Sequence, residues 1–136
     1  NCVSHEGVVN QGMPHPRFYG TFPRVLGRYV HREQVTPLAH AIFKMTGATA
    51  RALRLRDRGL LRVGLSADVT LFEPDVFLDL STYQDPHSYP AGQRTTVLVN
   101  GEVVIDQAQH TGALPGRVLR RNADGSVGFN APANSP

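Results

Sequence analysis

The sequence predicts a mixed fold in which helices come first and antiparallel strands follow. Two observations indicate this order. Apolar residues recur at spacings of three and four from Phe22 onward, and an Asn100-Gly101 pair separates two apolar runs later in the chain. The first pattern is typical of an amphipathic helix and the second of a β-hairpin. With ten prolines and thirteen glycines among 136 residues, the chain is expected to use short elements and many turns.

The first expected helix begins near Thr21, after a loop over residues 1–21 that is rich in Gly, Pro, His and Asn. Pro23 would lie in its first turn, where the missing backbone N–H is not needed. One face of this helix is apolar and consists of Phe22, Val25, Leu26, Tyr29 and Val30. The opposite face carries Arg24, Arg28 and Arg32.

Two further short helices are expected next. Thr36 and Pro37 fit the N-cap and the first position of one, whose apolar stripe is Leu38, Ala41, Ile42 and Met45. Thr46 fits the N-cap of the other, which continues through alanine-rich residues to about Leu53. Gly59 then closes the helical part in a turn.

The strands follow from residue 60 onward. Residues 69–72 form a short apolar run, and residues 95–99 and 102–105 form two more on either side of Asn100 and Gly101. This pair predicts a hairpin because the favoured two-residue turn needs positive φ at both central positions.

The last part of the chain is expected to add a strand over residues 117–119 and then a flexible tail over residues 122–136. Neither the helical part nor the strand part has enough elements to cover its own apolar face. Both parts are therefore expected to pack against something larger.

Charge and cysteine content argue against several classes of function. The formal net charge of +3 comes from scattered basic residues, without the lysine-rich or aromatic-interleaved patches of nucleic-acid-binding proteins. The single cysteine, Cys2, excludes an internal disulfide framework and fits a cytoplasmic protein. No apolar run approaches the roughly 20 residues that a membrane helix needs. We expect neither a nucleic-acid nor a membrane partner.

The six histidines do not form a metal-binding motif. They are His5, His15, His31, His40, His87 and His110, and no two of them stand one helical turn apart. His31 and His40 are expected on exposed helix faces, and His87 and His110 are expected to be exposed in turn-rich segments. We expect no complete metal site within this chain.

His15 and Arg17 are the strongest candidates for a functional site. Pro14 and Pro16 restrict the backbone on both sides of His15 and so fix how the two side chains project. An arginine held in this way can bind a carboxylate through two parallel hydrogen bonds, and a histidine can orient a neighbour. The residues alone leave open a second interpretation, in which both side chains only brace the loop.

Three segments carry a resemblance to a known family. The most specific covers residues 15–30 and reads HPRFYGTFPRVLGRYV. The other two read KMTGATARALRLRDRGLLRVGLSADVTLFEPD and TYQDPHSYPAGQRTTVLVNGEVVIDQAQHTGALPGRVLRR. In this order they resemble the D-aminoacylases (N-acyl-D-amino-acid deacylases), a metal-dependent branch of the amidohydrolase superfamily. The resemblance covers most of residues 6–121.

The resemblance implies a fold of class α/β plus β. Residues 1–59 would supply the last helices and an active-site loop of a metal-dependent (β/α) barrel, and residues 60–121 the C-terminal strands of a small β-sandwich. In the family, His, Cys and Asp side chains at the strand ends hold the metal, and the catalytic Asp stands in a Ser-Asp-Gly motif shortly before the HPR element. This chain has no such motif, and Cys2 matches no family ligand. We therefore expect the C-terminal portion of such an enzyme, without catalytic or metal-binding residues of its own.

The activity that the resemblance implies is zinc-dependent hydrolysis of an N-acyl-D-amino acid to a carboxylate and a D-amino acid, with a zinc-bound water as nucleophile. By position, His15, Arg17 and Tyr19 match the family motif and would line the mouth of the active site, with Arg17 the first choice for a substrate contact. The chain alone is expected to be inactive and to need the remainder of its own polypeptide. Departures from the family pattern at Phe18, and at Val9 with Asn10, leave the acyl and side-chain preference open.

Two alternatives remain at this point. One is a portion of a dihydroorotase-like cyclic-amide hydrolase, which shares the VLVNGEVV hairpin but is expected to lack the HPR-to-RYV element. The other is a noncatalytic β-sandwich binding module.

Overall fold

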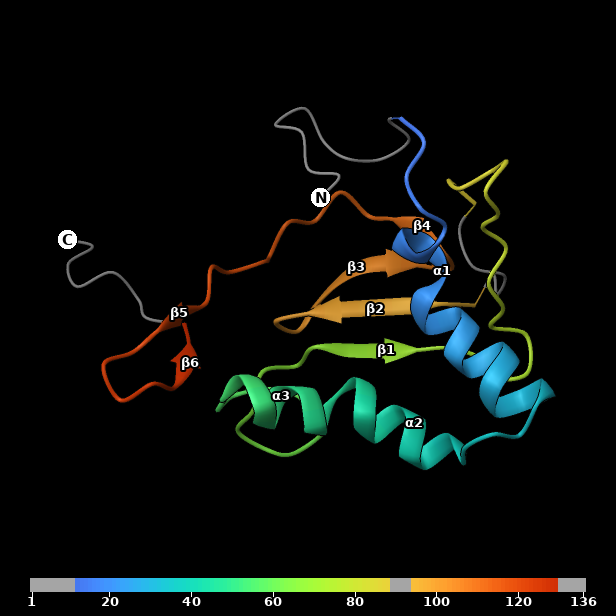
Figure 1. The fold of residues 1–136 in the computed structure, drawn as a ribbon. Coiled ribbons are helices and arrows are strands. Elements are labelled where there is room, and N and C mark those ends of the chain that lie inside the picture. The colour runs from blue at the N-terminus through green and yellow to red at the C-terminus, as the bar shows by residue number, and fades with distance from the viewer. Residues whose placement is uncertain (1–11, 89–93, 130–136) are drawn as a thin grey trace. The chain divides into compact units, whose positions relative to one another are not determined.

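A computed structural model describes residues 12–88 and 94–129 of the chain (Figure 1). Contacts divide the chain into two compact units, and each unit combines two stretches that are separated in sequence. The first unit is drawn from Asn1–Ala41 and Phe72–Gln93, and the second from Ile42–Leu71 and Arg94–Pro136.

The first unit opens with a helix that starts earlier than the sequence pattern indicates. Helix α1 spans Arg17–Arg24 and continues directly into η1, a π-helix over Val25–Arg32. The prediction of a loop over residues 1–21 is therefore wrong for residues 17–21, which are helical. Pro16 explains the early start, because its φ of −51° is already helical and its carbonyl accepts the N–H groups of Tyr19 and Gly20 at 3.2 and 3.0 Å.

Pro23 consequently lies inside the helical run and not in its first turn. A proline there lacks an N–H and crowds the carbonyl four residues earlier, and the chain after it winds as a π-helix. The apolar face expected for a regular α-helix is only partly buried as a result. Leu26 is 4% exposed, but Phe22 is 58% exposed, and Gly20 and Pro23 are buried in its place.

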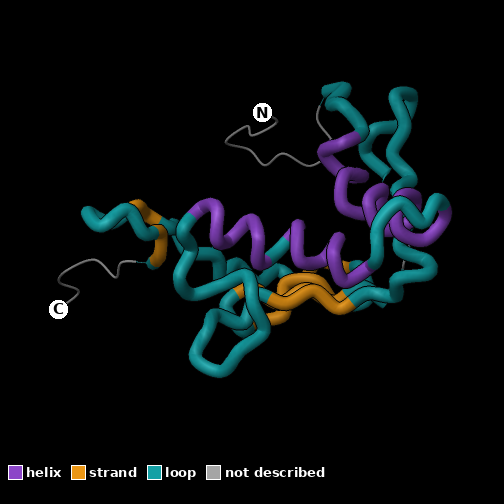
Figure 2. The backbone as a smooth tube through the Cα atoms, turned by 60° about the horizontal axis from the view of Figure 1, so that its bottom comes forward, coloured by secondary structure: helices purple, strands orange, loops and turns teal. Residues whose placement is uncertain are grey.

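Two glycines let the helical run pass close to the segment after residue 72. A Cβ at Gly20 would stand 3.2 Å from the Cβ of Asp79, and a Cβ at Gly27 would collide with the Leu78 side chain. Residues 72–88 form no helix or strand, and Figure 2 draws them as a loop beside the helix. A larger side chain at either glycine would push the two segments apart.

The two helices expected next are confirmed, as α2 over Leu38–Met45 and α3 over Gly47–Leu53. Ala41 in the expected apolar stripe of α2 is buried at 4% exposure. Thr46 occupies the N-cap position of α3, but its hydroxyl donates to the carbonyl of Ile42 at 2.7 Å and caps nothing.

The second unit contains a four-stranded antiparallel sheet in the order β1-β2-β3-β4 (Figure 1). Its strands are Val69–Leu71, Thr96–Val99, Glu102–Asp106 and Gln109–His110. The predicted hairpin is confirmed, since β2 pairs with β3 around Asn100 and Gly101, whose φ values are 50° and 84°.

A separate hairpin follows in the same unit, with β5 at Arg120–Arg121 and β6 at Val127–Gly128. The strand expected at residues 117–119 is wrong, because the turn at Asn122 and Gly125 sets the pairing three residues later. The flexible tail expected from residue 122 also differs from the structure up to residue 129. Ser126 is 3% exposed there and donates its backbone N–H to Asp124 at 2.9 Å. Residues 130–136 lie outside the described residues.

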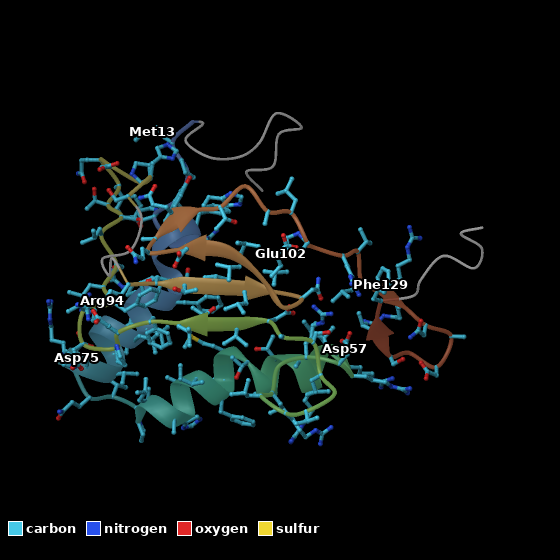
Figure 3. All side chains as sticks on the ribbon, turned by 180° about the vertical axis from the view of Figure 1, so that it is seen from behind. Met13, Asp57, Asp75, Arg94, Glu102 and Phe129 are labelled. Carbon is cyan, nitrogen blue, oxygen red and sulfur yellow. The ribbon has the colours of Figure 1, made fainter. Side chains whose placement is uncertain are left out.

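Charged side chains connect the long loop before β1 to the β2–β3 turn. Arg58 donates to both carboxylate oxygens of Asp57, at 3.0 and 3.1 Å, and to Asp68 at 2.5 Å. Asp68 also accepts the backbone N–H of Asn100 at 2.8 Å. The hydrogen bonds from Arg58 lower the pKa of Asp57, which is labelled in Figure 3, although partial burial opposes this.

Few side chains of the described residues are fully buried. Apart from prolines, the buried apolar side chains of the described residues are Leu26, Ala41 and Ala50, whereas Leu61, Val63 and Leu114 are 87% exposed or more. This agrees with the expectation that the elements are too few to cover their apolar faces. No helix within residues 12–88 and 94–129 combines the length and the apolar character that crossing a membrane requires.

Candidate functional site

A cavity of about 590 Å³ lies in the first unit between α1 and residues 79–84. Its helix side presents Arg17, Thr21 and Arg24. We call residues 79–88 the wall loop, because the first part of this loop forms the opposite side. Of the three predicted site residues, His15 and Arg17 line the cavity and Tyr19 does not.

His15 connects the start of α1 to the wall loop. Its Nδ1 accepts the backbone N–H of Arg17 at 3.1 Å, and its Nε2 lies 3.0 Å from the hydroxyl of Tyr83. Because Nδ1 accepts, the ring proton is on Nε2, and Nε2 donates to the Tyr83 oxygen. The two rings meet edge to face, with centroids 5.2 Å apart. His15 thus accepts the first backbone N–H of the helix and contacts the cavity wall at the same time.

Tyr19 makes the matching connection from the helix side. Its hydroxyl lies 3.3 Å from Nδ1 of His87, and the rings are again edge to face at 5.7 Å. The other ring nitrogen of His87 donates to the carbonyl of Gly12 at 2.8 Å, so Nδ1 is left to accept from Tyr19. The prediction that His87 is an exposed turn histidine is therefore wrong, since the ring is half-buried and both nitrogens are bonded.

The wall loop is closed by hydrogen bonds of its own. Thr82 and Asp85 bond each other twice, because each backbone N–H donates to an oxygen of the other residue at 2.9 Å. Ser81 donates to the carbonyl of Ser88 at 2.7 Å. Pro86, within the same loop, is fully buried. These hydrogen bonds close the wall loop on itself.

The charges along the helix side differ in their partners. Arg24 bonds Asp79 at 2.9 Å, and hydrogen bonds to Tyr29 and to Asp79 raise the pKa of Arg24. The side chain of Arg17 is exposed, and no carboxylate among the described residues pairs with it. Considering only residues 12–88 and 94–129, Arg17 therefore gives the cavity a positive charge without a carboxylate partner, which suits a ligand carboxylate.

The histidines outside the cavity that the structure describes form no metal centre. His31 lies 3.6 Å from Asp75 on an exposed surface, and His40 and His110 are exposed as expected. Among residues 12–88 and 94–129, no three His, Cys, Asp or Glu side chains gather as a metal ion would require. Cys2 and His5 lie outside the described residues.

This geometry can be compared with that of known proteins. The model of a family described as "Amidohydrolase family" matches residues 8–105, which is well over half of the chain. The chain belongs to the amidohydrolase family. The matched range includes the whole cavity, from His15 at the start of α1 to the wall loop.

Relatives within the family agree with the resemblance seen in the sequence. The chain is 46% identical over 121 residues to an N-acyl-D-glutamate deacylase from Alcaligenes xylosoxydans xylosoxydans. This match covers 89% of the chain but only 24% of that relative. The chain thus spans about a quarter of the length of this curated relative.

Two solved structures share the fold of the chain. A D-aminoacylase structure superposes with a TM-score of 0.71 at 41% identity, covering 74% of this chain and 21% of that one. An N-acyl-D-glutamate deacylase from Bordetella bronchiseptica, solved with zinc and a phosphonate mimic of the tetrahedral intermediate, gives a TM-score of 0.65 at 42% identity. That match covers 68% of this chain and 19% of the other. Of these two structures, the deacylase from Bordetella bronchiseptica contains zinc.

The sequence analysis missed Tyr83 and His87. Both stand in the TYQDPHSYP segment that carried part of the resemblance, yet neither was predicted as a site residue. The available signal was weak, because a Tyr and a His in a Pro-rich loop are normally solvent-exposed, and Tyr83 is indeed 70% exposed. Their partners are 68 residues away in sequence, and only folding brings them together.

Proposed function

We propose that this chain is the C-terminal portion of a zinc-dependent amidohydrolase that hydrolyses N-acyl-D-amino acids, and that Arg17 binds the substrate carboxylate. The charge of Arg17, which lies at the cavity and has no carboxylate partner in the part of the chain that the structure describes, carries this proposal. Every N-acyl amino acid keeps a free carboxylate next to the amide that is cleaved. A guanidinium that holds this carboxylate would orient the amide toward the reacting centre.

The neighbouring charges support the choice of Arg17 over Arg24. Arg24 already has a carboxylate partner in Asp79 at 2.9 Å, and a substrate would have to displace it. Arg17 would meet the substrate without breaking an ion pair. His15 would hold the backbone N–H of Arg17 through its Nδ1. Tyr19 would act indirectly, by holding the wall loop through its hydrogen bond to His87.

The rest of the enzyme follows from the same proposal. Residues 1–59 would be the end of a (β/α) barrel, with its active-site loop and last helices, and residues 60–121 part of a small β-sandwich, as the similarity to D-aminoacylase structures suggests. Zinc and the catalytic Asp would be supplied by other parts of the polypeptide. When bound, zinc would activate a water molecule for attack on the amide carbonyl. A cytoplasmic location is proposed on the cysteine content alone.

Substitution of Arg17 tests the proposal in the protein made from the complete reading frame. We expect hydrolysis of N-acetyl-D-amino acids, and an increase in KM of roughly 10- to 100-fold for Arg17→Ala, because charged hydrogen bonds contribute about 1.5–3 kcal/mol. The control is Arg32→Ala, since Arg32 is also exposed on the helical run but does not line the cavity. An unchanged KM for Arg17→Ala would show that Arg17 is not the carboxylate ligand.

The same assay addresses the alternatives. A dihydroorotase-like enzyme would hydrolyse a cyclic amide and leave N-acetyl-D-amino acids intact. A noncatalytic module would hydrolyse neither. No observation on the cavity favours either alternative over a deacylase.

A further inference from the structure

We propose that Tyr83 and His87 are positioning residues that hold Arg17 in place by fastening the wall loop to the start of α1. The inference rests on the proposed function, since it concerns the same cavity. It assigns a task to two residues that do not need to touch the reacting atoms.

The two connections have matched spacing. His15 and Tyr19 stand one helical turn apart, and their partners Tyr83 and His87 are also four residues apart. The residue types are crossed, because the helix side gives a His and then a Tyr, whereas the loop gives a Tyr and then a His. A single contact of this kind would still let the helix end rotate. Two contacts one turn apart also fix the rotation of the helix end about its axis.

Arg17 lies between the two connections. Its backbone N–H donates to His15 Nδ1 at 3.1 Å, and the same imidazole contacts Tyr83 through its other nitrogen. A shift of the wall loop would therefore move the ring that caps Arg17. Because the loop is closed by its own Thr82–Asp85 and Ser81–Ser88 hydrogen bonds, it provides a firm support.

The tautomers suggest variants that remove one contact at a time. Tyr83→Phe keeps the ring and removes the oxygen that accepts from His15 Nε2. His15→Asn keeps an oxygen near Nδ1 to accept from Arg17 and removes the contact to Tyr83. Tyr19→Phe removes the hydroxyl that donates to His87. Since neither Tyr19 nor His87 lines the cavity, an effect of Tyr19→Phe on substrate binding cannot come from a lost contact with a ligand in that cavity.

The test uses the complete enzyme and an N-acetyl-D-amino acid. We expect Tyr83→Phe, His15→Asn and Tyr19→Phe each to raise KM roughly two- to tenfold with kcat nearly unchanged, because each loses a hydrogen bond between the wall loop and the start of α1, and binding is affected equally in ground and transition states. The double variant of Tyr83→Phe and His15→Asn should be no worse than either single one, because both remove the same contact.

His110→Asn is a matched control. His110 Nδ1 also accepts a backbone N–H two residues later, from Gly112 at 2.9 Å, but His110 lies in the second unit and is not at the cavity. It should leave KM unchanged. An effect of the same size in the control would overturn the proposal.

The outcomes separate this inference from the proposed function. If Arg17→Ala raises KM while Tyr83→Phe and Tyr19→Phe do not, the positioning role is refuted and the carboxylate site stands. If the enzyme hydrolyses no N-acyl-D-amino acid, the positioning role can still be tested by measuring hydrogen exchange at the backbone amide of Arg17. Exchange should be roughly two- to tenfold faster in Tyr83→Phe than in the unsubstituted protein, and equal rates would sink the inference.

Discussion

Three arginines of this chain show how the partner of a side chain decides what it can do. Arg58 is held by Asp57 and Asp68 and connects a loop to a turn. Arg24 is held by a single carboxylate at the cavity, Asp79. Arg17 has no such partner among the described residues and lines the same cavity. Of the three, Arg17 can bind a ligand anion without first breaking an ion pair.

Gly27 is the residue at which close packing in the first unit can be tested. An added Cβ would overlap the Leu78 side chain and stand 3.0 Å from the carbonyl oxygen of Phe77. We expect Gly27→Ala to lower the free energy of unfolding by about 1–3 kcal/mol, as overpacking generally does. Urea denaturation measures this, with Gly116→Ala as control, because nothing lies within 4 Å of a Cβ at Gly116. If the two variants were equally stable, the segment at Phe77 and Leu78 would be able to move away from the added methyl group.

At the scale of elements, the sequence predicts best where a local rule applies. The hairpin follows from Asn100 and Gly101 alone, because their turn type depends on backbone conformation and on no distant contact. The start of α1 was misplaced, since Pro16, Gly20 and Pro23 are normally typical of loops. Here the proline begins the helix, and the glycine is needed for close packing against Asp79.

The residues of the candidate site also differ in whether the sequence alone could predict them. His15 and Arg17 could be predicted, because neighbouring prolines mark a restrained backbone. The wall loop could not, because its contacts to α1 join residues far apart in sequence and depend on the tautomer of each ring. Helical periodicity also failed after Pro23, since a π-helix has more residues per turn than the pattern assumes.

The Asp57 and Arg58 contact makes the loop before β1 sensitive to acid. The pKa of Asp57 is lowered mainly by hydrogen bonds from Arg58, so its stabilising effect is complete above the ordinary aspartate pKa of about 4 and is lost as the pH falls through the lower folded value. We expect the difference in unfolding free energy between the unsubstituted protein and Asp57→Asn to be constant from about pH 7 to 5 and to shrink below about pH 4. Urea denaturation across this range measures it.

Asp106→Asn is the control for this pH series, because the side chain of Asp106 accepts a hydrogen bond from a neutral hydroxyl, that of Thr96 at 3.5 Å. Its effect should be smaller than that of Asp57→Asn at neutral pH. If the Asp57→Asn difference stayed constant down to about pH 2, the ion pair would not be the source of the acid sensitivity.

At the scale of the whole molecule, the chain is much shorter than the relatives that it matches. It spans 24% of the N-acyl-D-glutamate deacylase it resembles, and large apolar side chains such as Leu61 and Val63 are 91% and 101% exposed. Exposed apolar side chains of this size are typical of surfaces that another part of a protein covers. Both observations favour a larger polypeptide in which this chain is one portion.

The last prediction concerns the 136-residue chain by itself. We expect it to show no hydrolysis of N-acetyl-D-methionine with added zinc, because under the proposed function the metal ligands and the catalytic Asp would belong to other parts of the polypeptide. Co-expression with the rest of its reading frame as a separate chain is expected to restore activity, since Leu61, Val63 and Leu114 would regain a covering surface. A triple substitution of these three residues by Ser should weaken the reconstituted activity and leave the lone chain inactive. Zinc-dependent hydrolysis by the lone chain would refute the proposal that the metal ligands and the catalytic Asp lie outside it.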